Sequence, residues 1–299
     1  MKKVINRANI HGYVYDCNLK ISEVKKADSP VFGTKFITGK ISVATDEECV
    51  NVVDIRFGYV PPTTKNGSPN KTYDALDQIM NGATVLKDGK ENAIKVTASP
   101  SIVCNDFMNR QNELVSAKSL EGGFISIVNS VTPQAKFEAD FLVTKYTHYD
   151  EDTENEKPEY GKLDGYVFLF NGAIQPVSFN VKDAGGMGYF ESAVVPDQPL
   201  FLKVEGDIIS KTIKVKKEEQ GAWSVIVKEY DQTFREYLIT QAKEAYELGD
   251  ESILTQDEYK KALADRELKL AEVKKAHEER QNAPATTAPA PAAEGGFGW

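Results

Sequence analysis

Runs of alternating apolar and polar residues fill much of the first 230 positions, and this alternation constrains the fold more than any other feature of the sequence. Successive side chains of a strand point to opposite faces, so each run predicts a strand with one buried face. The first run places small or apolar residues on one side: Ala8, Ile10, Gly12 and Val14. Gly12 and Gly39 lie in mid-strand, which indicates bulges or the sharp coiling of a closing barrel.

The order of the predicted elements repeats along the chain. Three strands are followed by a short helix over 73–80, by a strand over 93–98, by a loop that holds Phe107 and Arg110, and by a strand over 124–128. This order is typical of the OB fold, a five-stranded barrel with a helix between its third and fourth strands. A similar order follows over 137–230, with a hairpin turn at Asn171-Gly172. The sequence therefore predicts a mainly β protein with two consecutive OB-like, five-stranded β-barrels.

From about residue 232 the apolar spacing becomes helical, and the last residues are rich in Pro, Ala and Gly. We therefore divide the chain into an OB-like domain (1–130), a second OB-like domain (131–231), a helical segment (232–282) and a flexible tail (283–299). The tail ends in Phe297 and Trp299. A passive spacer has no need of two large aromatic residues, so we predict that they dock on a partner.

The net charge of -9 is unevenly distributed. Residues 1–130 carry 16 Lys and Arg against 14 Asp and Glu, a balance of +2. The counts are 11 against 18 for 131–231 and 9 against 13 for 232–299. Binding of a polyanion is therefore expected mainly in the first domain. The acidic remainder could compete with a nucleic acid for that cationic surface.

Motifs that would indicate catalysis are missing from the sequence. It contains no P-loop, no HExxH, no GxSxG and no GxGxxG after a strand. Cys17, Cys49 and Cys104 lack the spacing of a metal site, and we expect them to be reduced thiols. No apolar stretch is long enough for a membrane span or a signal peptide. We therefore expect a cytoplasmic, non-enzymatic protein with no cofactor, no metal and no membrane contact.

Binding of a single strand requires aromatic faces for bases and cations for phosphates. The alternation predicts that such side chains share the outer face of the first barrel: Arg7, His11, Tyr13, Tyr15, Phe36, Lys40, Arg56 and Lys95. Aromatic residues on a strand surface also stabilise sheets through cross-strand pairs, and this structural role is the alternative.

Three segments carry a resemblance to a known family: INRANIHGYVYDCNLKI, GTKFITGKISVAT and NVVDIRFGYV. They resemble the opening strands of bacterial and phage OB-fold single-stranded DNA-binding proteins, in which N-x-A-x-I-x-G-Y/R-V begins strand one and F-x-x-G/A-x-I-A-V/T marks strand two. The resemblance covers roughly the first 130 residues, and the second domain is similar only in strand order. It implies sequence-independent binding of single-stranded DNA through a set of four residues: Tyr13, Tyr15, Phe36 and Lys40.

The resemblance also implies a role in phage-type DNA replication or recombination, in the host cytoplasm if the protein is phage-encoded. It also implies a tail that docks replication or recombination proteins. The C-terminal helices suggest a homo-oligomer that assembles along the strand. The tail departs from the family pattern, because AAEGGFGW has one acidic residue, Glu294, and no final Pro-Phe. The alternative function is a structural or scaffold oligomer, such as a virion component, which the acidic second domain and the charged helices favour.

Overall fold

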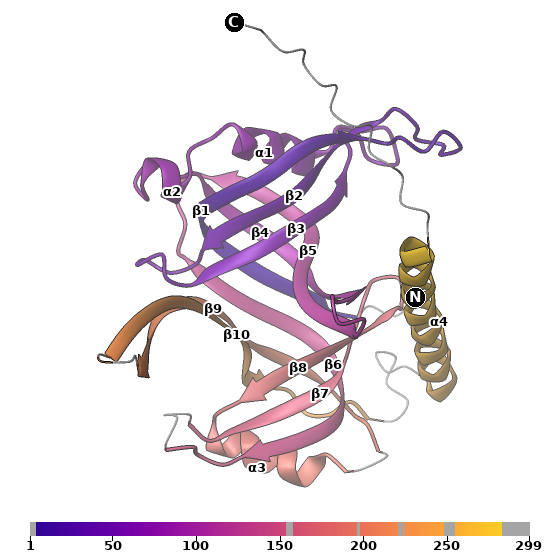
Figure 1. Cartoon of the computed structure of the whole chain (residues 1–299). Coiled ribbons are helices and arrows are strands. Elements are labelled where there is room, and N and C mark those ends of the chain that lie inside the picture. The colour runs from indigo at the N-terminus through magenta and orange to yellow at the C-terminus, as the bar shows by residue number, and fades with distance from the viewer. Residues whose placement is uncertain are drawn as a thin grey trace, which may run out of the picture.

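The computed structural model describes residues 4–153, 158–195, 198–220, 223, 225–247 and 255–282. In chain order the elements are β1 (Asn6–Glu23), β2 (Lys35–Ala44), β3 (Val52–Val60), α1 (Lys71–Met80), α2 (Val85–Asp88), β4 (Lys95–Met108), β5 (Leu114–Val128), β6 (Gln134–Tyr149), β7 (Tyr160–Phe168), β8 (Ile174–Val181), α3 (Ala184–Ala193), β9 (Leu200–Gln220), β10 (Val225–Ala242) and α4 (Gln256–Asn282). The protein is thus mainly β with few helices, as the alternation predicts (Figure 1).

The strands form one hydrogen-bonded sheet in the order β2-β3-β5-β4-β1-β6-β7-β8-β10-β9. Additional pairings of β2 with β1 and of β6 with β9 bring each half of the sheet back to its first strand. The first half therefore contains β1 to β5, and the second contains β6 to β10. An antiparallel ladder from Asn6–Ala139 to His11–Gln134 joins the halves through β1 and β6.

The alternating apolar residues form a core that continues from one half into the other. In the second half, the rings of Phe137 and Phe179 stack with centroids 4.8 Å apart. Phe141 packs edge-on against Phe179, with ring centroids 4.7 Å apart. In the first half, Leu76 and Ile79 of α1 are fully buried, so this helix covers the core as the sequence predicts.

Gly12 and Gly39 explain how the first half closes. A Cβ atom on Gly12 would lie 1.8 Å from the carbonyl oxygen of Ala44, so only glycine permits this approach of β1 to β2. Gly39 has a φ of 132°, and the register of β2 against β3 shifts between Ile37 and Gly39. The predicted bulge is confirmed at Gly39, and the close approach at Gly12 is a second reason for glycine in mid-strand.

Two segments differ from the sequence-based prediction. The region between the predicted strands of 93–98 and 124–128 is a long hairpin of β4 and β5, in which Phe107 is a strand residue. Residues 232–242 belong to β10 and pair with β9, so the helical prediction was wrong there. Spacings of four residues, such as that of Phe234 and Leu238, fit one face of a helix but also one face of a strand.

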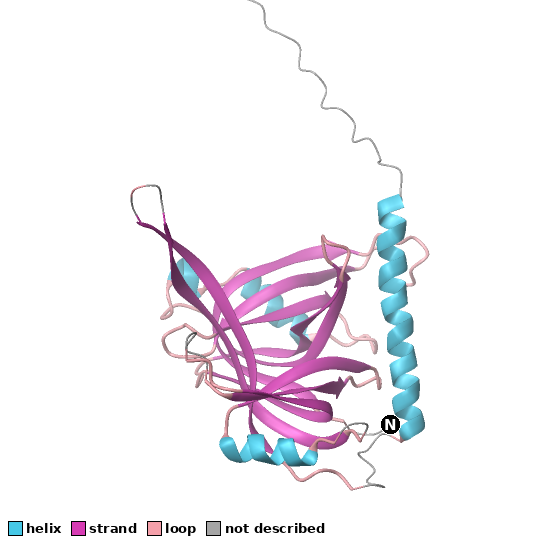
Figure 2. Ribbon diagram, turned by 60° about the horizontal axis from the view of Figure 1, so that its bottom comes forward, coloured by secondary structure: helices cyan, strands magenta, loops and turns pink. Residues whose placement is uncertain are grey.

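The helical prediction is confirmed for α4, which lies along one side of the sheet (Figure 2). In the described part of the chain, no helix combines the length and the apolar character that a membrane span requires. The predicted docking residues Phe297 and Trp299 lie outside the described residues.

Candidate nucleic-acid interface

The outward faces of β2 and β3 carry aromatic and cationic side chains side by side. The rings of Phe36 and Tyr59 lie 4.7 Å apart between their centroids, and Tyr59 is exposed. Lys40 and Arg56 are direct partners in the antiparallel ladder, so their side chains share one face. We call this surface, made by Phe36, Tyr59, Lys40 and Arg56, the β2–β3 face.

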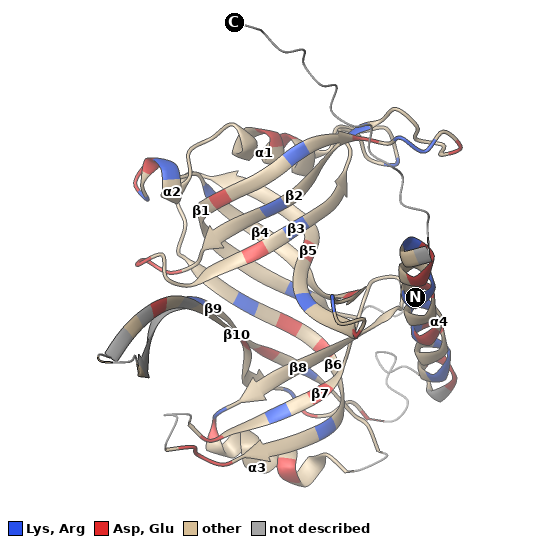
Figure 3. Cartoon of the chain, viewed as in Figure 1, with Lys and Arg blue, Asp and Glu red and all other residues tan. Residues whose placement is uncertain are grey.

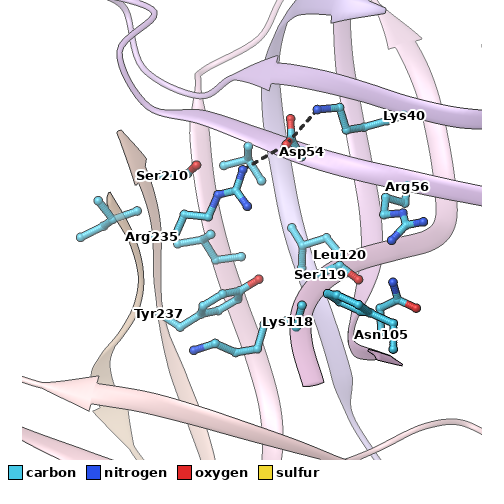
Figure 4. A pocket seen from close by; sticks show the side chains of 15 residues that line it. Lys40, Asp54, Arg56, Asn105, Lys118, Ser119, Leu120, Ser210, Arg235 and Tyr237 are labelled. Atoms are coloured by element: carbon cyan, nitrogen blue, oxygen red, sulfur yellow. Dashed lines mark hydrogen bonds and ion pairs between the residues drawn. The ribbon is translucent and has the colours of Figure 1, made fainter. Parts of the chain in front are cut away.

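Lys40 and Arg56 of the β2–β3 face also line a cavity of about 240 Å³ at the junction of the two halves (Figure 4). Its walls come from β2 and β3, from the β4–β5 hairpin and from β9 and β10. We call this the cationic groove and define it by its polar and aromatic lining: Lys40, Asp54, Arg56, Asn105, Phe107, Lys118, Arg235 and Tyr237.

Asp54 organises two of the cations in the groove. Its carboxylate accepts hydrogen bonds from Ser42 Oγ at 2.7 Å and Lys40 Nζ at 3.1 Å. Arg235 Nη2 of β10 lies 3.3 Å from the same carboxylate, so Asp54 links a cation from each half. Arg56 lies 3.9 Å from Glu121. All three cations keep about half of their side chains exposed, and remain available to phosphate oxygens.

Lys118 and Tyr237 form the inner end of the groove. The Nζ atom of Lys118 lies 5.0 Å from the Tyr237 ring centroid and donates a hydrogen bond of 2.7 Å to the carbonyl oxygen of Ser178. Burial lowers the pKa of the Lys118 ammonium, and burial likewise raises the pKa of the Tyr237 phenol. The Lys118 ammonium therefore lies over the face of a neutral Tyr237 ring.

Beyond the groove, β9 and β10 continue as a two-stranded arm that projects from the rest of the sheet (Figures 1 and 2). We define the β9–β10 arm as 211–220 together with 225–234. Asn51 fixes its base, because its side-chain amide accepts from Ser210 N at 2.6 Å and donates to Ile208 O at 3.0 Å. Tyr230 and Phe234 are exposed on the arm.

The arm also differs in charge from the rest of the second half. The sequence of the arm, 211–220 with 225–234, carries five Lys and Arg against four Asp and Glu, whereas 131–210 carry six against 14. Figure 3 shows acidic and basic residues interspersed on the strands of both halves. Neither half therefore has a uniformly basic set of strands. In the groove, Asp54 brings together a cation from each half, Lys40 and Arg235.

The structure brings Phe36, Lys40 and Arg56 together and places the other predicted residues elsewhere. Tyr13 is a correction, because it was expected on an open face but is buried beside Ala44 and Ala93. The Lys90 ammonium covers its ring, with Nζ 5.0 Å from the centroid. Tyr15 is half-buried against the same cluster. The segment that contains α2 therefore covers a face that the alternation alone left open.

The remaining predicted residues have partners within the protein. Arg7 pairs with Glu138 of β6 at 2.6 Å, and Glu138 also contacts Lys203 of β9. The Nδ1 atom of His11 lies 3.1 Å from the Gln134 amide nitrogen. Lys95 donates a 3.4 Å hydrogen bond to the carbonyl oxygen of Asn129. Arg7 and His11 thus connect the halves rather than line the groove.

Sequence reasoning missed Tyr59, Phe107, Lys118 and Arg235. Tyr59 follows a bulge that moves it to the same face as Phe36, and no alternation rule predicts such a shift. Phe107 and Lys118 lie on the hairpin that was expected to be a loop. Arg235 was assigned to a helix, although its place after Phe234 in an aromatic, charged run was a usable signal.

A family model named YorF matches residues 4–276, which is most of the chain. The chain belongs to the YorF family. No curated protein matches the sequence. Among solved structures, this YorF-family chain is similar to the wild-type single-stranded DNA-binding protein from Thermus aquaticus, with 8% identity, a TM-score of 0.46, and coverage of 82% of this chain and 95% of that one. A deletion mutant of the same Thermus aquaticus protein matches with 9% identity, a TM-score of 0.46, and coverage of 82% and 96%.

The described residues of the YorF-family protein contain no group of three or more His, Cys, Asp or Glu side chains that could hold a metal ion. The three cysteines carry free thiols. Burial raises the pKa of the Cys104 thiol to about 11, so it is protonated at neutral pH and a poor nucleophile.

Proposed function

We propose that this protein binds single-stranded DNA without sequence specificity, on the β2–β3 face and in the cationic groove. The observation that carries the proposal is the Phe36–Tyr59 ring pair, in which Tyr59 is exposed and Phe36 is half-buried, on the same two strands as the Lys40–Arg56 pair. Aromatic rings stack on any base, and cations contact any phosphate, so the combination favours binding that tolerates all sequences. Stacking also requires unpaired bases, which favours a single strand over a duplex.

The strand connections support a finer part of the proposal, that each half is an OB-type barrel. In the first half, β1-β2-β3-β5-β4 closes on β1, and α1 lies between β3 and β4 in the chain. OB folds bind oligonucleotides on strands 2 and 3 and on the loops between strands 1 and 2 and between strands 4 and 5. The β2–β3 face occupies the first of these positions. In the second half, the β9–β10 arm takes the position of the loop between strands 4 and 5, so we propose that the arm extends the binding surface.

The biological role that fits this activity is phage-type DNA replication or recombination, carried out without catalysis by the protein itself. The protein would cover single strands in the cytoplasm of a host cell. Docking of replication or recombination proteins through Phe297 and Trp299, and assembly of several copies along one strand, are further parts of the proposal.

A structural or scaffold function is the second candidate, and the burial of Tyr13 favours it, since one predicted base-contacting ring is covered by the chain itself. Light scattering with and without an oligonucleotide separates the two candidates. A discrete oligomer whose mass does not change when DNA is added would support the scaffold function. An increase in mass when DNA is added would support the proposed function.

The direct test is a titration of the full chain with oligo-dT, followed by the quenching of tyrosine and tryptophan fluorescence at two salt concentrations. We expect tight binding at low salt that weakens steeply as salt is added, because each neutralised phosphate releases counterions. Parallel titrations with oligo-U and with a duplex compare the affinity for single-stranded DNA with the affinities for RNA and for double-stranded DNA. Folded protein that binds no oligonucleotide at low salt would refute the proposed function.

A further inference from the structure

Helix α4 is attached to the β4–β5 hairpin by a buried ion pair. Arg266 Nη2 lies 2.9 Å from Asp106 Oδ1, and Arg266 Nη1 lies 3.2 Å from Asp106 Oδ2, so the contact is bidentate. Arg266 Nη2 is also 3.3 Å from the Ser116 hydroxyl on the neighbouring strand. The two charged side chains are only 9% and 14% exposed. Such pairs have strict geometry, because a planar guanidinium matches a carboxylate in one orientation.

A second contact joins the same helix to the tip of the hairpin. His277 Nε2 and Gln281 Nε2 each lie 2.9 Å from the side-chain oxygen of Asn112 in the turn between β4 and β5. Arg266 and His277 are 11 positions apart, which corresponds to roughly 16 Å along a helix. The helix therefore follows the hairpin from its middle to its tip.

The inward stripe of α4 contains Arg266 among mostly apolar neighbours. Its buried and half-buried residues are Tyr259, Ala262, Leu263, Arg266, Leu270, Val273 and His277. An arginine in the middle of such a stripe is costly to bury unless its partner is fixed. The ion pair between Arg266 and Asp106 therefore fixes one position of α4 along the hairpin, which apolar contacts alone would not do.

The opposite face of this hairpin is a wall of the cationic groove. Asn105 and Phe107 both line the groove, and Asp106 lies between them on β4. Neighbouring side chains of a strand point to opposite faces, so Asp106 meets α4 while Asn105 and Phe107 meet the groove. Because Asp106 and Phe107 are adjacent on β4, any movement of Asp106 also moves Phe107 in the wall of the groove.

Few other contacts in the described part of the chain hold the outer section of the hairpin. The parallel ladder of β5 with β3 ends at Leu120 and Glu121, and Cys104 and Lys118 form hydrogen bonds to β8 at the inner end. Farther out, the ladder of β4 with β5 runs to Met108–Leu114 without a third strand. An isolated two-stranded hairpin is marginally stable in water, so the position of this section depends on side-chain contacts.

We propose that α4 is a strap that sets the width of the cationic groove by holding the β4–β5 hairpin, with Arg266 and Asp106 as positioning residues. The proposal rests on the proposed function, because the groove is where the single strand lies. A strap of this kind acts on affinity without touching the nucleic acid. It assigns a binding role to a helix that lies outside both halves of the sheet.

The test uses the full chain with Arg266→Gln and, separately, Asp106→Asn. The matched control is Lys275→Gln, which removes the exposed Lys275–Glu279 ion pair from the same helix. Amide hydrogen exchange near the hairpin tip, over 109–116, reports whether α4 still holds the hairpin. The affinity for oligo-dT, measured where every variant is folded, reports whether the groove depends on the strap.

We expect exchange at the tip to become at least about tenfold faster in both variants, because a broken buried pair leaves an uncompensated group. We expect the affinity to fall roughly 2- to 30-fold, the range of coupling through intermediate residues. The control should change neither quantity. A double variant that swaps the two charges, Arg266→Asp with Asp106→Arg, should restore much of the slow hydrogen exchange at the tip and much of the affinity for oligo-dT.

Faster exchange with unchanged affinity would overturn the positioning role, and unchanged exchange would overturn the strap itself. If Arg266→Gln does not fold, Arg266→Lys keeps the charge but loses the bidentate contact, and is expected to show the same two effects more weakly. Failure of the wild-type chain to bind oligo-dT would instead refute the proposed function, and the exchange measurement would then decide alone whether α4 holds the hairpin.

Discussion

Replacing Tyr59 by alanine isolates the aromatic part of the proposed interface. Tyr59 is 46% exposed and its ring lies 4.7 Å from Phe36, so it contributes little to the core and is open to a base. Stacking of one base on an aromatic side chain contributes about 1–3 kcal/mol. With about 1.4 kcal/mol per factor of ten, Tyr59→Ala should weaken binding of oligo-dT about 5- to 150-fold.

The same substitution should cost little stability. Loss of the ring contact with Phe36 removes about 0.5–1.5 kcal/mol of aromatic pairing, and no cavity forms at an exposed position. The assay combines fluorescence anisotropy of labelled oligo-dT with thermal unfolding of the same samples. A large change in affinity together with a small change in unfolding temperature is the expected signature.

The chain offers a matched control in Tyr149. It is 41% exposed and its ring stacks on Tyr160 at 4.8 Å, but the pair lies on β6 and β7, away from the groove. Tyr149→Ala should leave the affinity unchanged. Equal effects of the two substitutions, or none from either, would refute the assignment of Tyr59 to the interface.

Three further predictions test other parts of the interface and its support. Lys40→Gln should reduce the slope of log affinity against log salt by about 0.7, the value for one phosphate contact on a single strand, and an unchanged slope would remove Lys40 from the site. Tyr13→Ala should lower the free energy of unfolding by about 3–5 kcal/mol, as for other buried aromatic residues, while folded protein binds DNA normally; weaker binding without loss of stability would return Tyr13 to the interface. Burial of Glu138 acts to raise its pKa, but Lys203 and Arg7 more than offset this, so its folded pKa is below the unfolded value of about 4.3. The stabilisation is therefore present above that value and lost as the pH falls through the folded pKa. Glu138→Gln should destabilise the protein at pH 7, and the loss should shrink as the pH is lowered below about 4.3 in denaturant titrations. A loss that stays equal down to the lowest pH at which the protein folds would refute the ion-pair account.

Much of the fold was predictable from the alternation, because burial of one face is a local demand on each strand. The position of α1 and the need for glycine at Gly12 and Gly39 followed from the same reasoning. The β4–β5 hairpin was not predictable in this way, since none of the residues in its outer section, 103–108 and 114–119, is buried in the sheet core. Its position comes from α4, in which Arg266 lies 160 residues after Asp106 in the chain.

The boundary predicted at residue 231 falls inside β10, because four-residue spacing does not distinguish a helix from a strand. This matters for experiments as well as for description. Removal of 232–299 would take away Tyr237 and Ile239, which are buried in the core, so the predicted competition by an acidic C-terminal segment cannot be tested with that truncation.

The interface was predictable only in part. Phe36, Lys40 and Arg56 followed from the alternation of neighbouring strands, which keeps them on one outward face. Tyr13 obeys the same alternation, but a segment from elsewhere in the chain covers it. Arg235 joins the groove through tertiary packing of the second half on the first, and pattern reasoning within one segment contains no information about such a meeting.

The most direct test of the proposed interface is amide hydrogen exchange of the full chain with and without a saturating oligo-dT. The proposal predicts slower exchange in β2 and β3 around Phe36 and Tyr59 and in the hairpin around Phe107, and no change around the Tyr149–Tyr160 pair. Protection confined to other strands, or no protection at an oligonucleotide concentration that saturates binding, would contradict the placement of the single strand on the β2–β3 face and in the cationic groove.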